Sequence, residues 1–590
     1  MSLTHCQLPA SPRAPRLLAI LNRHLQQRGC APVAAVPCLP EGGPGLVFAL
    51  DAALGREEFR LTLAQPGRLE VAAGSELGLI FGLGKMLRTG RFTDGEFAFG
   101  DWRGCDRPQG AVRGMYYASH FHNWYHVASE EELTQYTEDL ALWGVNTLKA
   151  ILPAINLDGW NDPATAPALE RLRRLGGIAR ELGMGFATSA TNTWFRGTPK
   201  ALLAAPLPDP TQRHGNSGFP ICPSRPEGLA LILDNCRQLF ERLAPVELDC
   251  LWMWPYDEGG CGCPACHPWG ANGYYRMSRE IARLARHYFP KLKVVLSTWT
   301  FDTPEEGEWA GLARQLAQGN DWLDYILADA HEDFPAYPLQ HPAPGGLPFL
   351  NFPEISMWEM FPWGGYGANP FPIRLQRLWR QSGHLLAGGF PYSEGIFEDL
   401  NKIVAVRFYW DRNVTAQQTL AEYIAYEFSP AVVGDVLCLI RQLEGTHMQV
   451  ALAGVRARVE HLRGKPDCAA LAREAENVQH LLESALAEEH LPQESDQGAI
   501  RAACALAETV AVKLPAWAAR GWRWRILYLR ALLDRERLAG GGLATPAAEA
   551  ALRELIAIFH ARMEDDGSDP YHHRVRPPLA AGAAPLSLRQ

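Results

Sequence analysis

The stretch "LDCLWMWPYDE", residues 248–258, joins an apolar run to a pair of acids, Asp257 and Glu258. Seven other stretches between Val112 and Trp410 have the same form, a short apolar run that ends in polar or aromatic residues. The eight runs span residues 112–119, 145–153, 184–192, 248–258, 293–302, 324–332, 348–357 and 384–395. Amphipathic helical segments separate them, for example residues 129–144 and 272–289.

This alternation predicts the fold. Apolar strands that alternate with amphipathic helices indicate parallel strands that are covered on both faces. Eight such units over about 300 residues predict an α/β fold of the (β/α)8 TIM-barrel type. An open, doubly wound sheet is the alternative, but no glycine-rich phosphate loop follows the first strand.

The segments on either side of the barrel have different patterns. We expect residues 1–105 to form a small N-terminal α/β domain, with strands at 45–51, 59–65 and 68–74 and a helix at 75–90 that Ser75 caps. The barrel then spans residues 106–412. Residues 413–568 are rich in Ala, Leu, Glu and Arg and predict a helical domain, and residues 569–590 have the composition of a disordered tail.

The composition of the chain limits the kinds of molecule that we expect it to bind. The chain of 590 residues is 47% hydrophobic and 21% charged, which is typical of a globular protein. A net charge of -9 without a basic block argues against a nucleic-acid partner. We expect no membrane span and no secretion signal in residues 1–29. The 13 cysteines, an odd number in a long chain, favour reduced thiols and a cytoplasmic location. Assembly into a homo-oligomer is left open.

A TIM barrel carries its chemistry at the carboxyl ends of its strands. Acids and flat rings gather there, without a phosphate loop, and this combination predicts an oligosaccharide or other glycoside as the substrate. The candidate catalytic residues are Glu258, Asp257 and Glu354. The candidate substrate-binding residues are His120, Asn192, Tyr256, Trp299, His331, Trp358, Tyr392 and Glu394. Burial against Trp254, Tyr256 and Trp299 is expected to keep Glu258 protonated, as a general acid requires.

A cysteine cluster follows the acids directly. Cys263–His267 matches the C-x-x-C-H pattern of haem attachment, but that chemistry requires an exported chain. Cys261, Cys263, Cys266 and His267 can instead hold a structural zinc, or the thiols can remain free and stiffen the loop. In neither case do we expect a catalytic metal or a cofactor.

Three segments carry a resemblance to a known group of enzymes. Residues 69–92, 112–121 and 254–260, the last reading "WPYDEGG", resemble the small N-terminal domain, the first barrel strand and the strand-four Asp-Glu pair of β-N-acetylhexosaminidase-type glycoside hydrolases. Residues 69–92 are also similar to the small N-terminal domain of the α-glucuronidases. Residues 257–266, "DEGGCGCPAC", resemble endo-acting N-glycan hydrolases.

The resemblance implies a glycosidase that acts on an amino-sugar-containing oligosaccharide. It implies that Glu258 is the general acid and that Asp257 orients a substrate acetamido group, which attacks the anomeric carbon. The sequence departs from the hexosaminidases in "YYASHFHNW", residues 116–124, which lacks the arginine that their first strand uses to grip the sugar.

Four alternatives remain open. Glu258 can act as acid/base with Glu354 as a nucleophile, a retaining scheme that requires carboxyls about 5 Å apart. The substrate can be a uronide, as for an α-glucuronidase. The barrel can be a metal-dependent hydrolase or isomerase that uses His120, His122 and His331, or it can bind sugars without catalysis.

Overall fold

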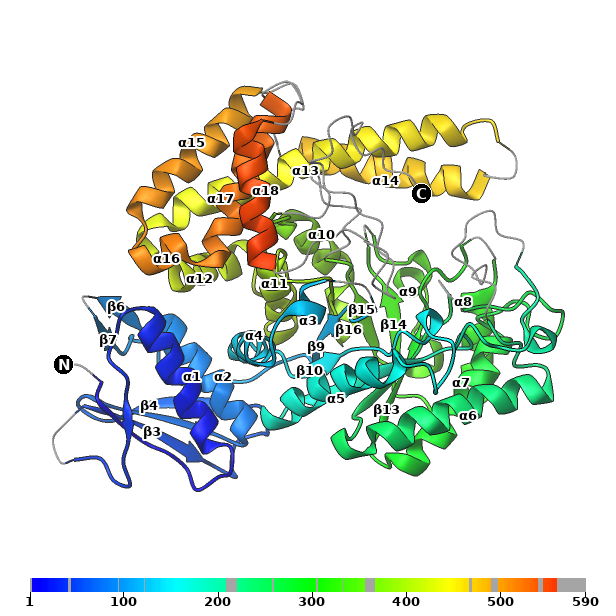
Figure 1. The fold of residues 1–590 in the computed structure, drawn as a ribbon, viewed down its shortest axis with the longest axis horizontal. Coiled ribbons are helices and arrows are strands. Elements are labelled where there is room, and N and C mark those ends of the chain that lie inside the picture. The colour runs from blue at the N-terminus through cyan, green and yellow to red at the C-terminus, as the bar shows by residue number, and fades with distance from the viewer. Residues whose placement is uncertain are drawn as a thin grey trace.

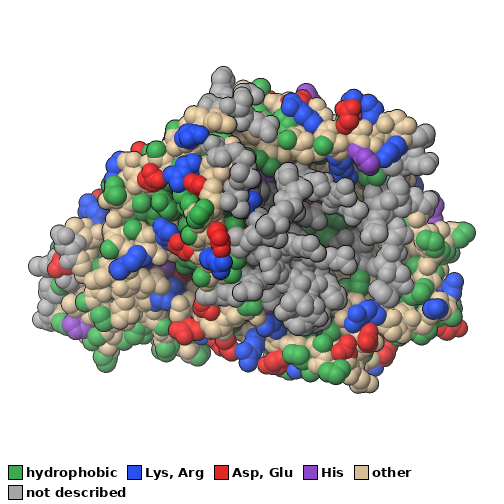
Figure 2. Space-filling view, turned by 45° about the horizontal axis from the view of Figure 1, so that its top comes forward, with side chains coloured by type: hydrophobic (Ala, Val, Ile, Leu, Met, Phe, Trp, Pro, Cys, Tyr) green, Lys and Arg blue, Asp and Glu red, His purple; other side chains and the backbone are tan. Residues whose placement is uncertain are grey.

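The structure, a computed structural model, has three regions: a small sheet with its helices, a barrel, and a set of helices at the C-terminal end (Figure 1). The residues that it describes are 3–40, 44–93, 95–120, 123–207, 220–256, 259–303, 306–331, 333–355, 367–465, 469–489, 497–539 and 545–559. Lys and Arg side chains are interspersed with Asp and Glu over the described part of the face in Figure 2.

Eight parallel strands form a closed barrel, which confirms the predicted fold class. The strands, in order around the barrel, are β9 (Val112–Tyr117), β10 (Thr147–Lys149), β11 (Gly185–Ala190), β12 (Cys250–Met253), β13 (Lys293–Ser297), β14 (Tyr325–Asp329), β15 (Phe349–Phe352) and β16 (Leu386–Gly389). The barrel closes because β9 pairs with both β10 and β16. A short strand β17 (Tyr392–Ser393) extends the pairing along β9.

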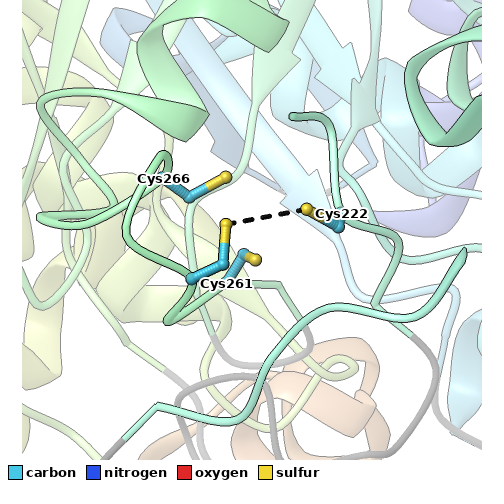
Figure 3. A group of neighbouring side chains, drawn as sticks. Cys222, Cys261 and Cys266 are labelled. Carbon is cyan, nitrogen blue, oxygen red and sulfur yellow. Dashed lines mark hydrogen bonds between the residues drawn. The ribbon is translucent and has the colours of Figure 1, made fainter. Parts of the chain in front are cut away.

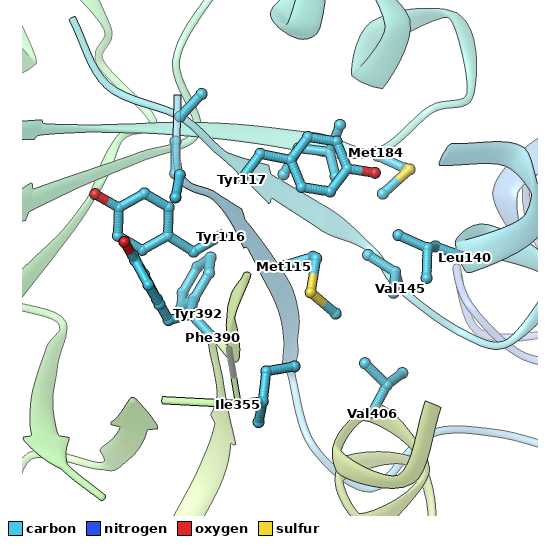
Figure 4. Packing of buried hydrophobic residues seen from close by; sticks show 14 of the residues in the cluster. Met115, Tyr116, Tyr117, Leu140, Val145, Met184, Ile355, Phe390, Tyr392 and Val406 are labelled. Carbon is cyan, nitrogen blue, oxygen red and sulfur yellow. The ribbon is translucent and has the colours of Figure 1, made fainter. Parts of the chain in front are cut away.

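Side chains of β9 alternate between the two faces of the barrel wall (Figure 4). Tyr116 lies with Phe390 and Tyr392 in the barrel interior, whereas Met115 and Tyr117 lie on the side of the surrounding helices. All three β9 residues are buried. Burial of both faces explains why the strands have continuous apolar runs in the sequence instead of a strict alternation.

Helices follow the strands and cover the barrel. They are α3 (Trp124–Val127), α4 (Glu130–Leu142), α5 (Thr165–Glu181), α6 (Pro226–Leu243), α7 (Gly273–Tyr288), α8 (Glu308–Ala317), α9 (Ala336–Gln340), α10 (Pro372–Ser382) and α11 (Asp399–Trp410). Helix α4 begins with a capping box, in which Ser129 and Glu132 each bind the other's backbone amide.

The N-terminal region is a six-stranded sheet with two helices. The strand order is β2 (Ala34–Ala35), β1 (His5–Gln7), β3 (Gly45–Leu50), β5 (Arg68–Ala73), β4 (Phe59–Gln65) and β8 (Gly104–Asp106). The helices are α1 (Ala14–Gln27) and α2 (Glu76–Thr89), and Ser75 caps α2 as predicted. A small hairpin, β6 (Arg91–Thr93) with β7 (Glu96–Ala98), follows α2. The fully buried Arg113 of β9 donates to Glu57 at 2.7 Å, which ties this region to the barrel.

The C-terminal region is helical. It comprises α12 (Ala416–Glu427), α13 (Val433–Leu462), α14 (Ala469–Glu488), α15 (Gln497–Lys513), α16 (Ala516–Arg520), α17 (Trp522–Asp534) and α18 (Pro546–Phe559). Arg523 of α17 reaches two barrel helices, with hydrogen bonds of 2.9 Å to Asp139 and to Asp399. The proposed tail, residues 569–590, lies outside the described residues. None of the described helices combines the length and the hydropathy needed to cross a bilayer.

Candidate active site

The predicted site residues come from the carboxyl ends of several barrel strands, which share one rim. Asp257, Glu258 and Trp358 lie outside the described residues, as does His122. The neighbours of the acid pair are described on both sides: Tyr256 precedes it and Gly259 follows it.

Aromatic rings line the interior of the barrel towards this rim. Trp299, at the end of β13, stacks on Trp254 with 5.5 Å between ring centroids. Tyr392 meets Tyr116 edge to face at 5.1 Å. His120 lies next to both tyrosine rings, at 5.9 and 6.1 Å. The structure thus places Trp299, Tyr392 and His120 on a ring-lined surface of the kind that apolar sugar faces contact.

Two candidate acids lie on the side of strands β15 and β17. Glu354 follows β15 and forms an ion pair with Nδ1 of His331, which follows β14. The Tyr392 hydroxyl donates to Oε1 of Glu394 at 2.8 Å. Burial raises the pKa of Tyr392, and the negative charges of Glu394 and Glu354 raise it further. Four predicted residues, His331, Glu354, Tyr392 and Glu394, are therefore brought into one electrostatic group.

The segment before the acid pair is held by buried hydrogen bonds. Tyr256 is buried, and its hydroxyl donates to Oε1 of Glu308 at 2.5 Å. The same oxygen accepts the backbone amide of Gly270 at 2.6 Å. The indole of Trp269 donates to the carbonyl of Pro255 at 2.7 Å. The hydroxyl of Tyr256 is thus directed to helix α8, and its contribution is to fix the position at which the acids begin.

Asn192 holds the segment after the acid pair. Its side-chain amide donates to the carbonyls of Ile221 and Gly260 at 2.9 and 3.0 Å, and its oxygen accepts the amide of Gly260 at 3.1 Å. Asn192 is fully buried. A side chain engaged in this way positions the loop, whereas a direct contact of Asn192 with substrate stays a prediction.

Glycines make this loop possible. A Cβ on Gly259 would lie 2.6 Å from the carbonyl oxygen of Pro255, and Gly260 has a φ of +131°. Side chains other than hydrogen do not fit the first position, and L residues rarely adopt the second conformation. The sequence "DEGG" therefore combines two acids with the two residues that allow the chain to turn behind them.

Two residues at the site were not among the sequence candidates. Lys149 ends β10 inside the barrel, with its Nζ 3.2 Å from the ring centroid of Tyr116 and 4.4 Å from that of Trp252. Burial holds the pKa of Lys149 well below its usual value. The sequence signal for it is a single cation within the apolar run of residues 145–153. The second, Cys222, lies 39 residues before Cys261 and had no local signal.

Cys222 joins the cysteines that follow the acids. Among the described residues, the one group suited to bind a metal consists of Cys222, Cys261, Cys263 and Cys266. His267, which the sequence offered as a ligand, is exposed and is not a member of this group. Three of the four candidate zinc ligands predicted from the sequence, Cys261, Cys263 and Cys266, therefore belong to this group.

No known family model matches the sequence, and no curated protein matches it either. Solved structures do align with it. A family GH115 4-O-methyl-alpha-glucuronidase, BtGH115A, described as specific for decorated arabinogalactans, aligns over 100% of this chain and 81% of its own, with a TM-score of 0.58 and 11% identity. A GH89 enzyme from Clostridium perfringens, solved with GlcNAc-alpha-1,4-galactose, aligns over 91% of this chain and 72% of its own, with a TM-score of 0.52 and 11% identity.

A GH20 exo-beta-N-acetylglucosaminidase from Vibrio harveyi aligns over 72% of this chain and 74% of its own, with a TM-score of 0.47 and 15% identity. Likeness at such identities shows the fold alone. Of these three structures, the two with TM-scores above 0.5 belong to families GH115 and GH89, so the likeness in fold is not particular to hexosaminidases.

Proposed function

We propose that this protein is a glycoside hydrolase whose substrate is an oligosaccharide that contains an amino sugar. Glu258 acts as general acid, and Glu354 is the second carboxylate. The observation that carries the proposal is the ion pair between Glu354 and His331 at the ring-lined end of the barrel. When His331 is protonated, its charge favours the ionised form of Glu354, and an ionised carboxylate is what the second position of a glycosidase requires.

The proposed reaction uses the two sides of the rim. Glu258 on the β12 side donates a proton to the glycosidic oxygen, and the leaving group departs as an alcohol. The carboxylate of Glu354 attacks the anomeric carbon from the other side, and water then releases the sugar with Glu258 as general base. In the alternative scheme the substrate acetamido group attacks, and Asp257 orients it.

The scheme is tested by paired variants. If Glu354 is the nucleophile, Glu354→Gln is inactive and Asp257→Asn keeps most activity, and a glycosyl-enzyme can be trapped on Glu354 with a fluorosugar. If the acetamido group attacks, Asp257→Asn is the severe variant and Glu354→Gln is mild. Retained activity in both variants would remove the two acids from the mechanism.

The substrate is found with a panel of chromogenic glycosides that includes N-acetylhexosaminides and uronides of both anomeric configurations. Uronides are the second candidate, because the GH115 glucuronidase aligns along this whole chain. Hydrolysis that stops with a chelator and returns with metal, while the fold and the loop of residues 259–266 stay intact, would favour a metal-dependent enzyme. Binding of sugars without hydrolysis of any of them would favour a non-catalytic sugar-binding barrel.

A further inference from the structure

The four cysteines behind the acid pair come from two separate segments of the chain. Cys222 lies just before α6, and Cys261, Cys263 and Cys266 lie in the loop that follows β12 and the acids. Their sulfur atoms all lie within 4.8 Å of one another, and Sγ of Cys222 is 3.8 Å from Sγ of Cys263. Figure 3 shows the sulfur atoms of Cys222, Cys261 and Cys266 gathered at one point between these segments.

These distances match a tetrahedral metal site. Zinc–sulfur bonds of about 2.3 Å at tetrahedral angles place the sulfur atoms about 3.8 Å apart. A disulfide, by contrast, requires sulfur atoms about 2.05 Å apart. Three of the four cysteines are buried and Cys263 is half-buried, so the site is closed, as structural zinc sites are.

The surroundings of the sulfur atoms also suit thiolate ligands. The hydroxyl of Ser224 lies 2.9 Å from Sγ of Cys266. Hydrogen bonds of this kind fix the direction of metal ligands and stabilise their charged form.

The spacing of the cysteines has a steric reason. Gly262, the middle residue of the C-x-C pair, donates its amide to the carbonyl of Ala205 at 2.9 Å. A Cβ on Gly262 would lie 2.4 Å from the carbonyl oxygen of Pro206. The loop can therefore bring Cys261 and Cys263 to one point only because a glycine separates them and lets the backbone pack against a neighbouring segment.

We propose that Cys222, Cys261, Cys263 and Cys266 bind one structural zinc ion, which ties the segment before α6 to the loop that carries Asp257 and Glu258. The same two segments are joined a second time by Asn192, which binds Ile221 next to Cys222 and Gly260 next to Cys261. The zinc ion and the side-chain amide of Asn192 together fix the backbone that follows the acid pair. The zinc takes no part in the reaction, because its four ligands leave no open position.

Elemental analysis of the purified full-length chain tests the site directly. We expect about one zinc per chain. Cys222→Ala should lose most of the zinc, because removal of one ligand opens the site. Two controls should keep it: Cys236→Ala, which removes a buried thiol of α6 outside the group, and His267→Ala.

Several results would overturn the proposal: no zinc in the wild-type protein, iron in its place, the four cysteines recovered as disulfides, or loss of zinc in His267→Ala with retention in Cys222→Ala. Cobalt substitution of the wild-type protein provides a measurement that does not depend on the folding of a variant. We expect intense thiolate-to-cobalt absorption and tetrahedral d–d bands. An octahedral spectrum without thiolate bands would contradict the site.

Hydrogen exchange tests the proposed role of the ion. Removal of zinc by a chelator should speed exchange of the amides in residues 259–266 and leave those of α1 unchanged, since α1 lies in the N-terminal region. Unchanged exchange in the loop would show that the ion does not hold it. Neither the zinc content nor the exchange depends on glycosidase activity, so these results stand even if the proposed function fails.

Discussion

The two sides of the barrel rim hold their acids in different ways. On the side of β12, the chain next to Asp257 and Glu258 is fixed by Tyr256, which donates to Glu308, by Asn192 and by the cysteine group. On the side of β15, Glu354 contacts the imidazole of His331, which is a cation when it is protonated. In the proposed mechanism the first side supplies a protonated acid and the second an ionised carboxylate. This difference is what a general acid and its partner carboxylate require.

The largest expected effect comes from the β12 side. Glu258→Gln should lower the hydrolysis rate about 10²–10⁴-fold, because the amide cannot donate the proton to the leaving group. The melting temperature should stay the same, since the described contacts on either side of the acid pair come from Trp269 and Asn192. Glu170→Gln, on the exposed surface of α5, is the matched control. A fully active Glu258→Gln enzyme would contradict the assignment of both sides.

A smaller loss is expected when the charge on the β15 side is weakened. His331→Gln removes the cationic partner of Glu354 and should lower the rate about 10²-fold or less, because Glu354 remains but is misplaced. The pH–rate profile should shift as well, since the carboxyl titrates without its partner. His341→Gln, in an exposed position after α9, is the control. An unchanged pH–rate profile would mean that the contact with His331 does not affect the protonation of Glu354.

The loop on the β12 side should depend on Asn192 for stability. Asn192→Ala leaves the buried backbone groups of Ile221 and Gly260 without partners and should cost about 1–3 kcal/mol in urea unfolding. Asn413→Ala, in an exposed turn, should be neutral. Equal stabilities of the two variants would show that Asn192 does not stabilise the loop. The side chain of Asn192 would then be available to bind substrate.

The smallest effect is a pH dependence on the β15 side. Glu444 of α13 accepts the amides of Ile373 and Arg374 at the start of α10, and burial raises its pKa to about 8. The folded state then binds more protons than the unfolded state between about pH 4.5 and 8, so stability falls as pH rises through this range. Glu444→Gln should remove this slope.

Thermal unfolding from pH 5 to 8 measures that slope, with the exposed Glu460 of the same helix as the control position. A wild-type protein that gains stability over this range would mean that the backbone amides around Glu444 outweigh its burial.

The barrel could be predicted from the sequence because its signal is local. Each strand is a short apolar run, and each run ends in the polar or aromatic residues of the rim, as in "LDCLWMWPYDE". Ser75 was recognised as a cap for the same reason, since a cap and its helix are neighbours in the chain. The domain boundaries and the catalytic roles remain predictions.

Contacts between distant segments could not be predicted. Cys222 lies 39 to 44 residues from the cysteines that it meets, and nothing in its own neighbourhood marks it. Asn192 has the polarity of a sugar ligand, but its partners are backbone groups of Ile221 and Gly260. In the sequence Lys149 is a single cation within an apolar run. Only the closure of the barrel brings its Nζ close to the rings of Tyr116 and Trp252.

The sequence was sufficient to identify the eight strand–helix units and the acids and rings at the strand ends. Burial on both faces requires an apolar composition in each strand, and this composition is recognisable one strand at a time. Tertiary structure decided which of these residues become partners: Glu354 with His331, Asn192 with the loop, and Cys222 with three later cysteines. The physical reason is that each of these contacts joins segments that are distant in the sequence. Closure of the barrel, rather than any local pattern, determines which of those segments meet.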